Sequence, residues 1–246
     1  MPFHLRPSAP TAADALICGD PARALTIAQH VMVQPRMSNH NRGLWGYHGE
    51  TASGRALTVQ ATGIGGPSAV VVLGEAAELG IRRLVRIGTS AAIGPCPHAL
   101  GSAVVVGSAV AADGTSAALN EGGVPGGAGA GGPGGSEAGT VPDRELTSAL
   151  GASADVPEAV VTSADLLPGP AAAPGLHDLQ TAAVLTLARR LGVAAAAALV
   201  VRSLDGRRLE DEPLEAALLR LADAAVAALG STGSDPTGPI PKPGTV

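Results

Sequence analysis

The sequence predicts an α/β fold in three layers, with helices on both faces of a mixed, largely parallel sheet that is partly closed into a barrel. Two observations support the α/β class. Short apolar runs of strand length alternate with helical patterns, and strands separated by helices imply crossover connections in a parallel sheet. The length of 246 residues and a hydrophobic content of 46% also suffice for one domain with a large core.

The first strand and helix show this pattern most clearly. The run ALIC at residues 15–18 predicts a strand, and a helix follows from Pro21 to about Val31. Asp20 is a favoured N-cap residue, and proline suits the first helical position because its fixed φ angle fits a helix. Apolar patterning likewise predicts strands at residues 56–61, 84–87, 103–110, 157–162 and 194–201, and helices at 67–79, 176–191 and 214–229.

The composition argues against several classes of protein. The net charge is −5 and the arginines are scattered, so no surface for a nucleic acid is indicated. No apolar run reaches the roughly 18 residues that a membrane helix needs, and the N-terminus lacks the apolar core of a signal peptide. Two cysteines, Cys18 and Cys96, make neither a disulfide framework nor a metal site. We therefore expect a soluble, cytoplasmic protein.

A glycine-rich stretch interrupts the strand and helix pattern at residues 121–140. Its sequence, EGGVPGGAGAGGPGGSEAGT, has too little apolar surface to offset the entropy lost on ordering. Because the pattern resumes near Asp143, we interpret the stretch as a mobile loop within one domain of residues 1–230. Residues 231–246 are predicted to be a disordered tail.

Three groups of motifs occur in an order that resembles one protein family. The first group is CGDPARA at residues 18–24. The second comprises NRG at 41–43, YHG at 47–49, TGIGGPS at 62–68 and RIGT at 86–89. The third comprises DGTS at 113–116, SAD at 163–165 and DLQTA at 178–182. Together, across about residues 1–205, they are similar to the nucleoside phosphorylases, the family that includes purine nucleoside and uridine phosphorylases; the GDP motif alone is a weak signal.

The resemblance implies a phosphate site formed by Gly19, Arg23, Arg86 and Thr89. A helix N-terminus offers unpaired amides to an anion, Gly19 permits close approach to the backbone, and Arg23 can add a bidentate contact. Arg86 follows a strand that is predicted to be buried, so it needs an anionic partner, and phosphate is one. Two alternatives stay open: the GDP motif can be a plain helix start, and Arg86 can pair with a carboxylate.

The same resemblance implies that Arg42 and His4 reach into the site of a neighbouring subunit. The chain is then expected to form a homo-oligomer, either a dimer or a hexamer built as a trimer of dimers. The alternative is that both residues lie on an ordinary surface, which for His4 has about equal weight because chain termini are usually mobile.

The ribose part of the site departs from the family pattern at Leu179-Gln180. The family has a glutamate in place of Gln180, and this glutamate accepts hydrogen bonds from both ribose hydroxyls. An amide has one acceptor oxygen and two donors, so Gln180 can still bind a diol. It lacks the charge that strengthens those bonds and stabilises positive charge on the ribose.

The base part of the site departs further. Ser203 stands where purine members have an aspartate that assists the leaving base, and Asp205 reaches that place only with a local shift of the chain. Leu167, shortly after Asp165, stands where the family has an aromatic residue that stacks on the base; an aliphatic wall holds a base with less stacking energy. Asp165, Leu167 and Ser203 are expected near the base.

The activity implied by the resemblance is phosphorolysis of a purine or uridine-like nucleoside to ribose 1-phosphate and a free base. Phosphate is the co-substrate, and no metal or organic cofactor is implied. Arg86, Ser203 and Asp205 are the candidate catalytic residues. Three alternatives remain: an enzyme that processes an unusual nucleoside, a catalytically weak or inactive nucleoside- or phosphate-binding relative on the same fold, and a hydrolytic nucleosidase. The presence of Arg23, Arg42 and Arg86 argues against the hydrolase.

Overall fold

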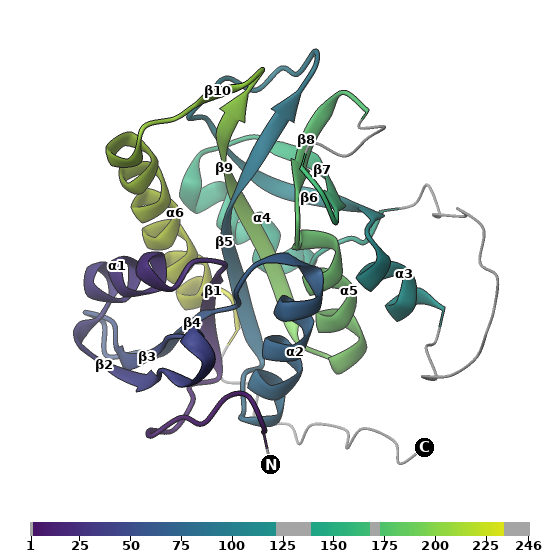
Figure 1. Cartoon of the computed structure of the whole chain (residues 1–246). Coiled ribbons are helices and arrows are strands. Elements are labelled where there is room, and N and C mark those ends of the chain that lie inside the picture. The colour runs from purple at the N-terminus through teal and green to yellow at the C-terminus, as the bar shows by residue number, and fades with distance from the viewer. Residues whose placement is uncertain (1, 122–138, 168–172, 234–246) are drawn as a thin grey trace.

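The structure is a computed structural model that describes residues 2–121, 139–167 and 173–233. Over these residues one mixed sheet carries helices on both faces, which confirms the predicted α/β class (Figure 1). The predicted loop at 121–140 lies outside the described residues except at its two ends. Of the predicted tail, only residues 231–233 are described, and Ser231 is the last residue of a helix.

All ten strands of the described residues join in one sheet. In chain order they are β1 (Asp14–Cys18), β2 (Val33–Asn39), β3 (Gly46–Glu50), β4 (Ala56–Ala61), β5 (Arg83–Ile93), β6 (Ala103–Ala112), β7 (Glu158–Ala164), β8 (Gly175–Asp178), β9 (Ala194–Leu204) and β10 (Arg207–Arg208). Their order across the sheet is β10-β9-β6-β7-β8-β5-β1-β4-β3-β2.

Five of these strands close into a ring. β5 pairs in parallel with β9 and antiparallel with β8, while β6 and β7 complete the ring between them. On its other side β5 pairs with β1, and β1 with β4, both in parallel. The antiparallel strands β3 and β2 extend the sheet to its edge. The predicted mixed sheet, partly closed into a barrel, is therefore confirmed.

Six α-helices of the described residues cover the two faces of the sheet (Figure 1). One face carries α1 (Pro21–Val31), α4 (Arg144–Ala154) and α6 (Asp211–Ser231), and the other carries α2 (Gly65–Glu78), α3 (Gly114–Asn120) and α5 (Thr181–Leu191). A short 3₁₀ turn, η1 (Asn41–Gly43), precedes β3. None of the helices in the described part of the chain is long and apolar enough to cross a membrane.

Alternation of side chains along the central strands creates two hydrophobic cores. In β1, Leu16 and Cys18 face the core under α1 and α6, whereas Ala15 and Ile17 face the core under α2 and α5. This follows from the period of two in a strand. Because both faces are covered by helices, residues 15–18 of β1 and most of β9 are buried on both sides and are apolar.

The observed elements differ from the predicted ones in two ways. The prediction of a helix from residue 176 is wrong at its start, because Gly175–Asp178 form β8 and α5 begins at Thr181. β8 exists because it pairs with β7 and β5, a tertiary pairing that the local pattern does not contain. The pattern also does not predict β2, β3 or α3. In β2, Pro35 interrupts the strand pattern, Gln34 has a φ of 51°, and the register with β3 shifts twice.

Glu75 of α2 holds the N-terminal segment in place. Its carboxylate accepts hydrogen bonds from the backbone N–H groups of Phe3, His4 and Leu5 and from Nδ1 of His4, the last at 2.7 Å. Burial raises the pKa of Glu75, but these hydrogen bonds outweigh that effect and lower the pKa to about 2. The ionised carboxylate therefore stabilises the folded position of the segment.

We expect Glu75→Gln to lower the free energy of unfolding at pH 7 by on the order of 2 kcal/mol. Since the folded-state pKa lies below its ordinary value of 4.5, the contribution of Glu75 is present above about pH 4.5 and is lost as the pH falls toward 2. Urea unfolding from pH 7 to pH 3 measures this difference, with Glu78→Gln, exposed on the same helix, as the control. A difference between wild type and Glu75→Gln that stays constant over this range would contradict the assignment.

Candidate functional site

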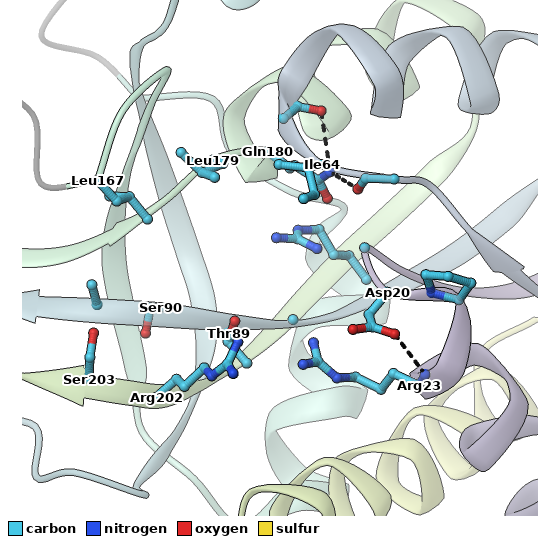
Figure 2. Close-up of a pocket in the computed structure, with 17 residues that line it drawn as sticks. Asp20, Arg23, Ile64, Thr89, Ser90, Leu167, Leu179, Gln180, Arg202 and Ser203 are labelled. Atoms are coloured by element: carbon cyan, nitrogen blue, oxygen red, sulfur yellow. Dashed lines mark hydrogen bonds between the residues drawn. The ribbon is translucent and has the colours of Figure 1, made fainter. Parts of the chain in front are cut away.

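A pocket of about 390 Å³ lies where β1, β4, β5 and β9 run in parallel (Figure 2). It is lined by the loops after β1 and β4, the middle of β5, the end of β9 and the residues before α5. Parallel strands present their carboxyl ends along one edge of a sheet, and ligands of α/β proteins bind at that edge. Segments far apart in the sequence thus meet at one place.

Most of the site residues predicted from the sequence line this pocket. They are Gly19, Arg23, Arg86, Thr89, Leu167, Leu179, Gln180 and Ser203. The residues predicted for phosphate and those predicted for the nucleoside therefore share one cavity. Their individual roles stay predictions.

Four predicted residues lie outside the lining of this pocket. His4 is bound to Glu75, and Arg42 is exposed in η1 with a φ of 57°. Asp165 is exposed and accepts a hydrogen bond from the first backbone N–H of α3. Asp205, with a φ of 48°, is an exposed residue of the two-residue turn between β9 and β10. The catalytic role predicted for Asp205 needs a shift of the chain that the structure does not contain.

Asp20 organises the loop after β1. Its Oδ1 accepts hydrogen bonds from the N–H groups of Ala22 and Arg23, at 2.8 and 3.1 Å, and so caps α1 as predicted. The expectation that unpaired amides of this helix receive an anion is wrong, because Pro21 has no N–H and Asp20 occupies the next two amides. An anion at this end of the pocket meets the guanidinium of Arg23 instead.

Arg86 is held by a buried network. Its Nη2 donates to Oδ2 of Asp178 at 2.7 Å, and its Nε donates to Oγ1 of Thr181 at 3.1 Å. Asp178 also accepts hydrogen bonds from Ser163 Oγ and from the N–H and hydroxyl of Thr181. A Cβ at Gly88 would lie 2.8 Å from Nη1 of Arg86, so a larger residue there would displace the guanidinium from this network. Of the alternatives left open by the sequence, the structure contains the pairing of Arg86 with a carboxylate.

The side chain of Gln180 is bound to the glycine-rich turn after β4. Its Nε2 donates to the carbonyl oxygens of Gly63 and Gly65, at 2.5 and 3.2 Å (Figure 2). Its Oε1 accepts from Thr62 Oγ1 at 3.3 Å. The two glycines have φ angles of 74° and 82°, which favour glycine. Gln180 therefore stabilises the turn. Its predicted contact with ribose now depends on Oε1 alone, because both amide donors are used.

The end of the pocket far from Arg23 is apolar (Figure 2). Leu167 and Leu179 line it, and Ser90 and Ser203 supply hydroxyl groups. The Oγ of Ser90 is buried and has no hydrogen-bond partner within the described residues. A flat ring with polar edges fits such a place, because its faces contact the leucines and its edges can bond to the hydroxyls.

Arg202 is a lining residue that the sequence analysis did not select. Counting from Gln180 places it directly before Ser203, so its position in the sequence was the available signal. That count sets Arg202-Ser203 against the Ser-Asp pair of purine members, and only Ser203, at the place of the aspartate, is predicted for the site. The structure places both residues in the lining.

Cys18 lies beneath the loop that contains Asp20. Burial raises the pKa of its thiol to about 12, although the charge of Arg23 acts in the opposite direction. The thiol is therefore protonated at neutral pH, and it donates to the carbonyl oxygen of Asp20 at 3.4 Å. Cys18 is a packing group, not a nucleophile. In the ranges 2–121, 139–167 and 173–233, no three His, Cys, Asp or Glu side chains are grouped so as to hold a metal ion.

The chain is similar to known proteins over part of its length. The sequence profile of the phosphorylase superfamily matches residues 14–170. A DeoD-type purine nucleoside phosphorylase of Oceanobacillus iheyensis is 39% identical over 79 residues, which are 32% of this chain and 33% of that protein. Uridine phosphorylases of Treponema pallidum and Haemophilus influenzae are 39% and 37% identical over 101 and 102 residues, which are 41% and 42% of this chain.

These similarities cover the two parts of the pocket unequally. The matched segments make up only 38% and 39% of the two uridine phosphorylases, so the chain spans well under half the length of these relatives. The range matched by the superfamily profile includes Arg23 and Arg86 but ends before Gln180 and Ser203. The comparisons therefore bear on the arginine end of the pocket more than on its apolar end.

We expect Gln180→Glu to destabilise the protein. A carboxylate has no N–H to donate, so it would face the carbonyl oxygens of Gly63 and Gly65 without a hydrogen bond, at a cost of about 1–3 kcal/mol. The resemblance alone would favour glutamate here, so the sign of the effect separates the two interpretations. The melting temperature should fall by several degrees, and further than for the uncharged variant Gln180→Met. An unchanged or higher melting temperature would show that the amide is not needed as a donor.

Proposed function

The chain belongs to the phosphorylase superfamily, and we propose that it is a nucleoside phosphorylase. It uses inorganic phosphate to cleave the glycosidic bond of a purine or uridine-like nucleoside, giving ribose 1-phosphate and a free base. One observation carries the proposal: the guanidinium groups of Arg23 and Arg86 line the same pocket as Leu167 and Leu179, and Arg23 lies at the end away from these leucines. Such a pocket suits an anion at the arginines next to a base whose apolar faces contact the leucines.

In the proposed reaction the phosphate is held by Arg23, Arg86 and Thr89. A phosphate oxygen forms a bond to C1′ of the ribose while the bond from C1′ to the base nitrogen breaks. The electron pair of the broken bond leaves with the base, which takes up a proton from solvent or through Ser203. The positive charge that develops on the ribose is stabilised by the adjacent phosphate, an interaction that strengthens in the transition state.

The reaction has little help from acidic side chains. Among the described residues that line the pocket, Asp20 is the one carboxylate, and it faces the amides of α1. Gln180 and Ser203 are uncharged, so phosphate supplies most of the stabilisation. The same observation favours a second candidate, a weak or inactive relative that binds phosphate and a nucleoside on the same fold.

The proposed ligands are a small-molecule nucleoside and phosphate. The reaction needs no metal or organic cofactor, because phosphate is the nucleophile and arginines supply the positive charge. A cytoplasmic location stays a prediction.

We further propose that a neighbouring subunit completes the site. Arg42 is exposed, and His4 is fixed by Glu75 beside the exposed side chain of Phe3, so neither contacts the pocket of its own chain. A second copy that brings Arg42 to the pocket adds a cation to the phosphate. This arrangement corresponds to the dimer or trimer of dimers that the resemblance implies.

We expect release of a free base from at least one nucleoside, and only when phosphate is present. A panel of purine and pyrimidine nucleosides, incubated with and without phosphate and analysed by chromatography, measures this. Arg23→Ala should lower the rate about 100-fold or more. Arg220→Ala, an exposed arginine of α6 outside the pocket, is the control and should leave the rate unchanged.

Arg23 is the better test because loss of Arg86 leaves Asp178 buried without a counter-charge. Base release that does not require phosphate would identify a hydrolase. Binding of a nucleoside without any base release would favour the inactive relative.

We expect light scattering at micromolar concentration to give a dimer or a hexamer. If Arg42 acts in a neighbour's site and Arg23 in its own, Arg42→Ala and Arg23→Ala are each poorly active alone. Refolding the two variants together should restore part of the activity, because one site of a mixed pair then contains both arginines. A monomer, or mixed assemblies that stay inactive, would rule out the shared site.

A further inference from the structure

Two guanidinium groups that belong to distant segments of the chain converge in the pocket. Arg23 extends from the first turn of α1 and Arg202 from the end of β9, and their side chains point toward each other near Thr89 (Figure 2). Within the described residues, neither guanidinium forms an ion pair. Two positive charges that face each other in a pocket favour binding of an anion, because an anion between them relieves their repulsion.

A β-bulge turns Arg202 into the pocket. Ser90 of β5 pairs with Val201, but the next residue, Ala91, pairs with Ser203, so Arg202 is an extra residue in β9. Both Arg202 and Ser203 therefore line the pocket, whereas successive residues of a regular strand point to opposite faces. Bulges that re-aim a side chain in this way are frequent beside functional sites.

Among the described residues, the nearby carboxylates are engaged elsewhere and form no ion pair with these two arginines. Asp178 pairs with Arg86, and the carboxylate of Asp20 is hydrogen-bonded to the amides of α1. Burial lowers the pKa of Arg23 and outweighs Cys18 and Asp20, which raise it, while the positive charges of Arg202 and Arg86 lower it further. Bringing two cations together costs free energy unless an anion between them repays it.

We propose that Arg202 and Arg23 form a two-sided clamp for the phosphate dianion. The inference rests on the proposed function and extends it, because the family resemblance places phosphate on Gly19, Arg23, Arg86 and Thr89 without Arg202. Each guanidinium presents parallel N–H donors that match two phosphate oxygens. The clamp holds the anion between the loop after β1 and the end of β9, next to the apolar part of the pocket.

Calorimetric titration of the full chain with inorganic phosphate, without nucleoside, tests the clamp. Arg202→Gln removes the charge and should weaken phosphate binding about tenfold or more, since a hydrogen bond to a charged group is lost. Arg202→Lys keeps the charge but not the paired donors and should give a smaller loss. Arg208→Gln is the matched control. Arg208 is an exposed residue of β10, opposite Ser203 in the sheet, and lies outside the pocket, so this variant should bind phosphate with the affinity of the wild type.

A parallel titration with ribose 1-phosphate separates the free anion from the same group on a sugar. Similar losses for both ligands in Arg202→Gln, with an unchanged melting temperature of the ligand-free protein, support the clamp. An unchanged affinity for inorganic phosphate in Arg202→Gln overturns it, as does a wild-type protein that binds no phosphate. Loss of phosphate binding in this variant together with a wild type that cleaves no nucleoside supports the clamp and refutes the proposed function. Phosphate-dependent cleavage by the wild type, with unchanged phosphate binding in Arg202→Gln, refutes the clamp and supports the proposed function.

Discussion

The buried ion pair between Arg86 and Asp178 is the interaction on which the pocket depends. It joins β5 to the end of β8, and Ser163 connects β7 to the same carboxylate. Both side chains are almost excluded from water, and removal of one partner of such a pair typically costs about 3–5 kcal/mol. Asp178 offsets much of the charge of Arg86, although the guanidinium of Arg86 still acts on Arg23 and lowers its pKa. The free positive charge of the pocket then lies on Arg23 and Arg202, where a ligand can reach it.

Elements with local signals could be predicted from the sequence, and elements that exist only through pairing could not. Asp20 and Pro21 mark the start of α1 because capping and the proline ring act within one turn. β9 is recognisable because a strand buried on both faces is apolar throughout. β8 has no such signal: its four residues form a strand because β7 and β5 offer backbone partners that come from elsewhere in the chain.

The same distinction between predictable and unpredictable features applies to the residues of the site. The motifs around Arg23 and Arg86 are contiguous, so their meeting in one pocket could be predicted. The contacts of Gln180 and the orientation of Arg202 could not, because the first depends on a turn more than a hundred residues away and the second on a bulge that sequence spacing does not reveal. In both places the chain differs from its family. Gln180, which donates hydrogen bonds to the glycine-rich turn, stands where the family has a glutamate. Arg202 stands at the position that precedes the aspartate of purine members.

The irregular strand β2 limits how copies of this chain can associate. A regular edge strand offers a row of free N–H and C=O groups on which a strand of another molecule can add. In β2, Pro35 removes one donor and two breaks of register interrupt the row, while β10 at the opposite edge is only two residues long. Among the strands of the described residues, neither edge offers a long, regular template for continuing the sheet into a second molecule. An assembly of this chain has to form through contacts between side chains, so its geometry is set by surface shape and not by backbone pairing.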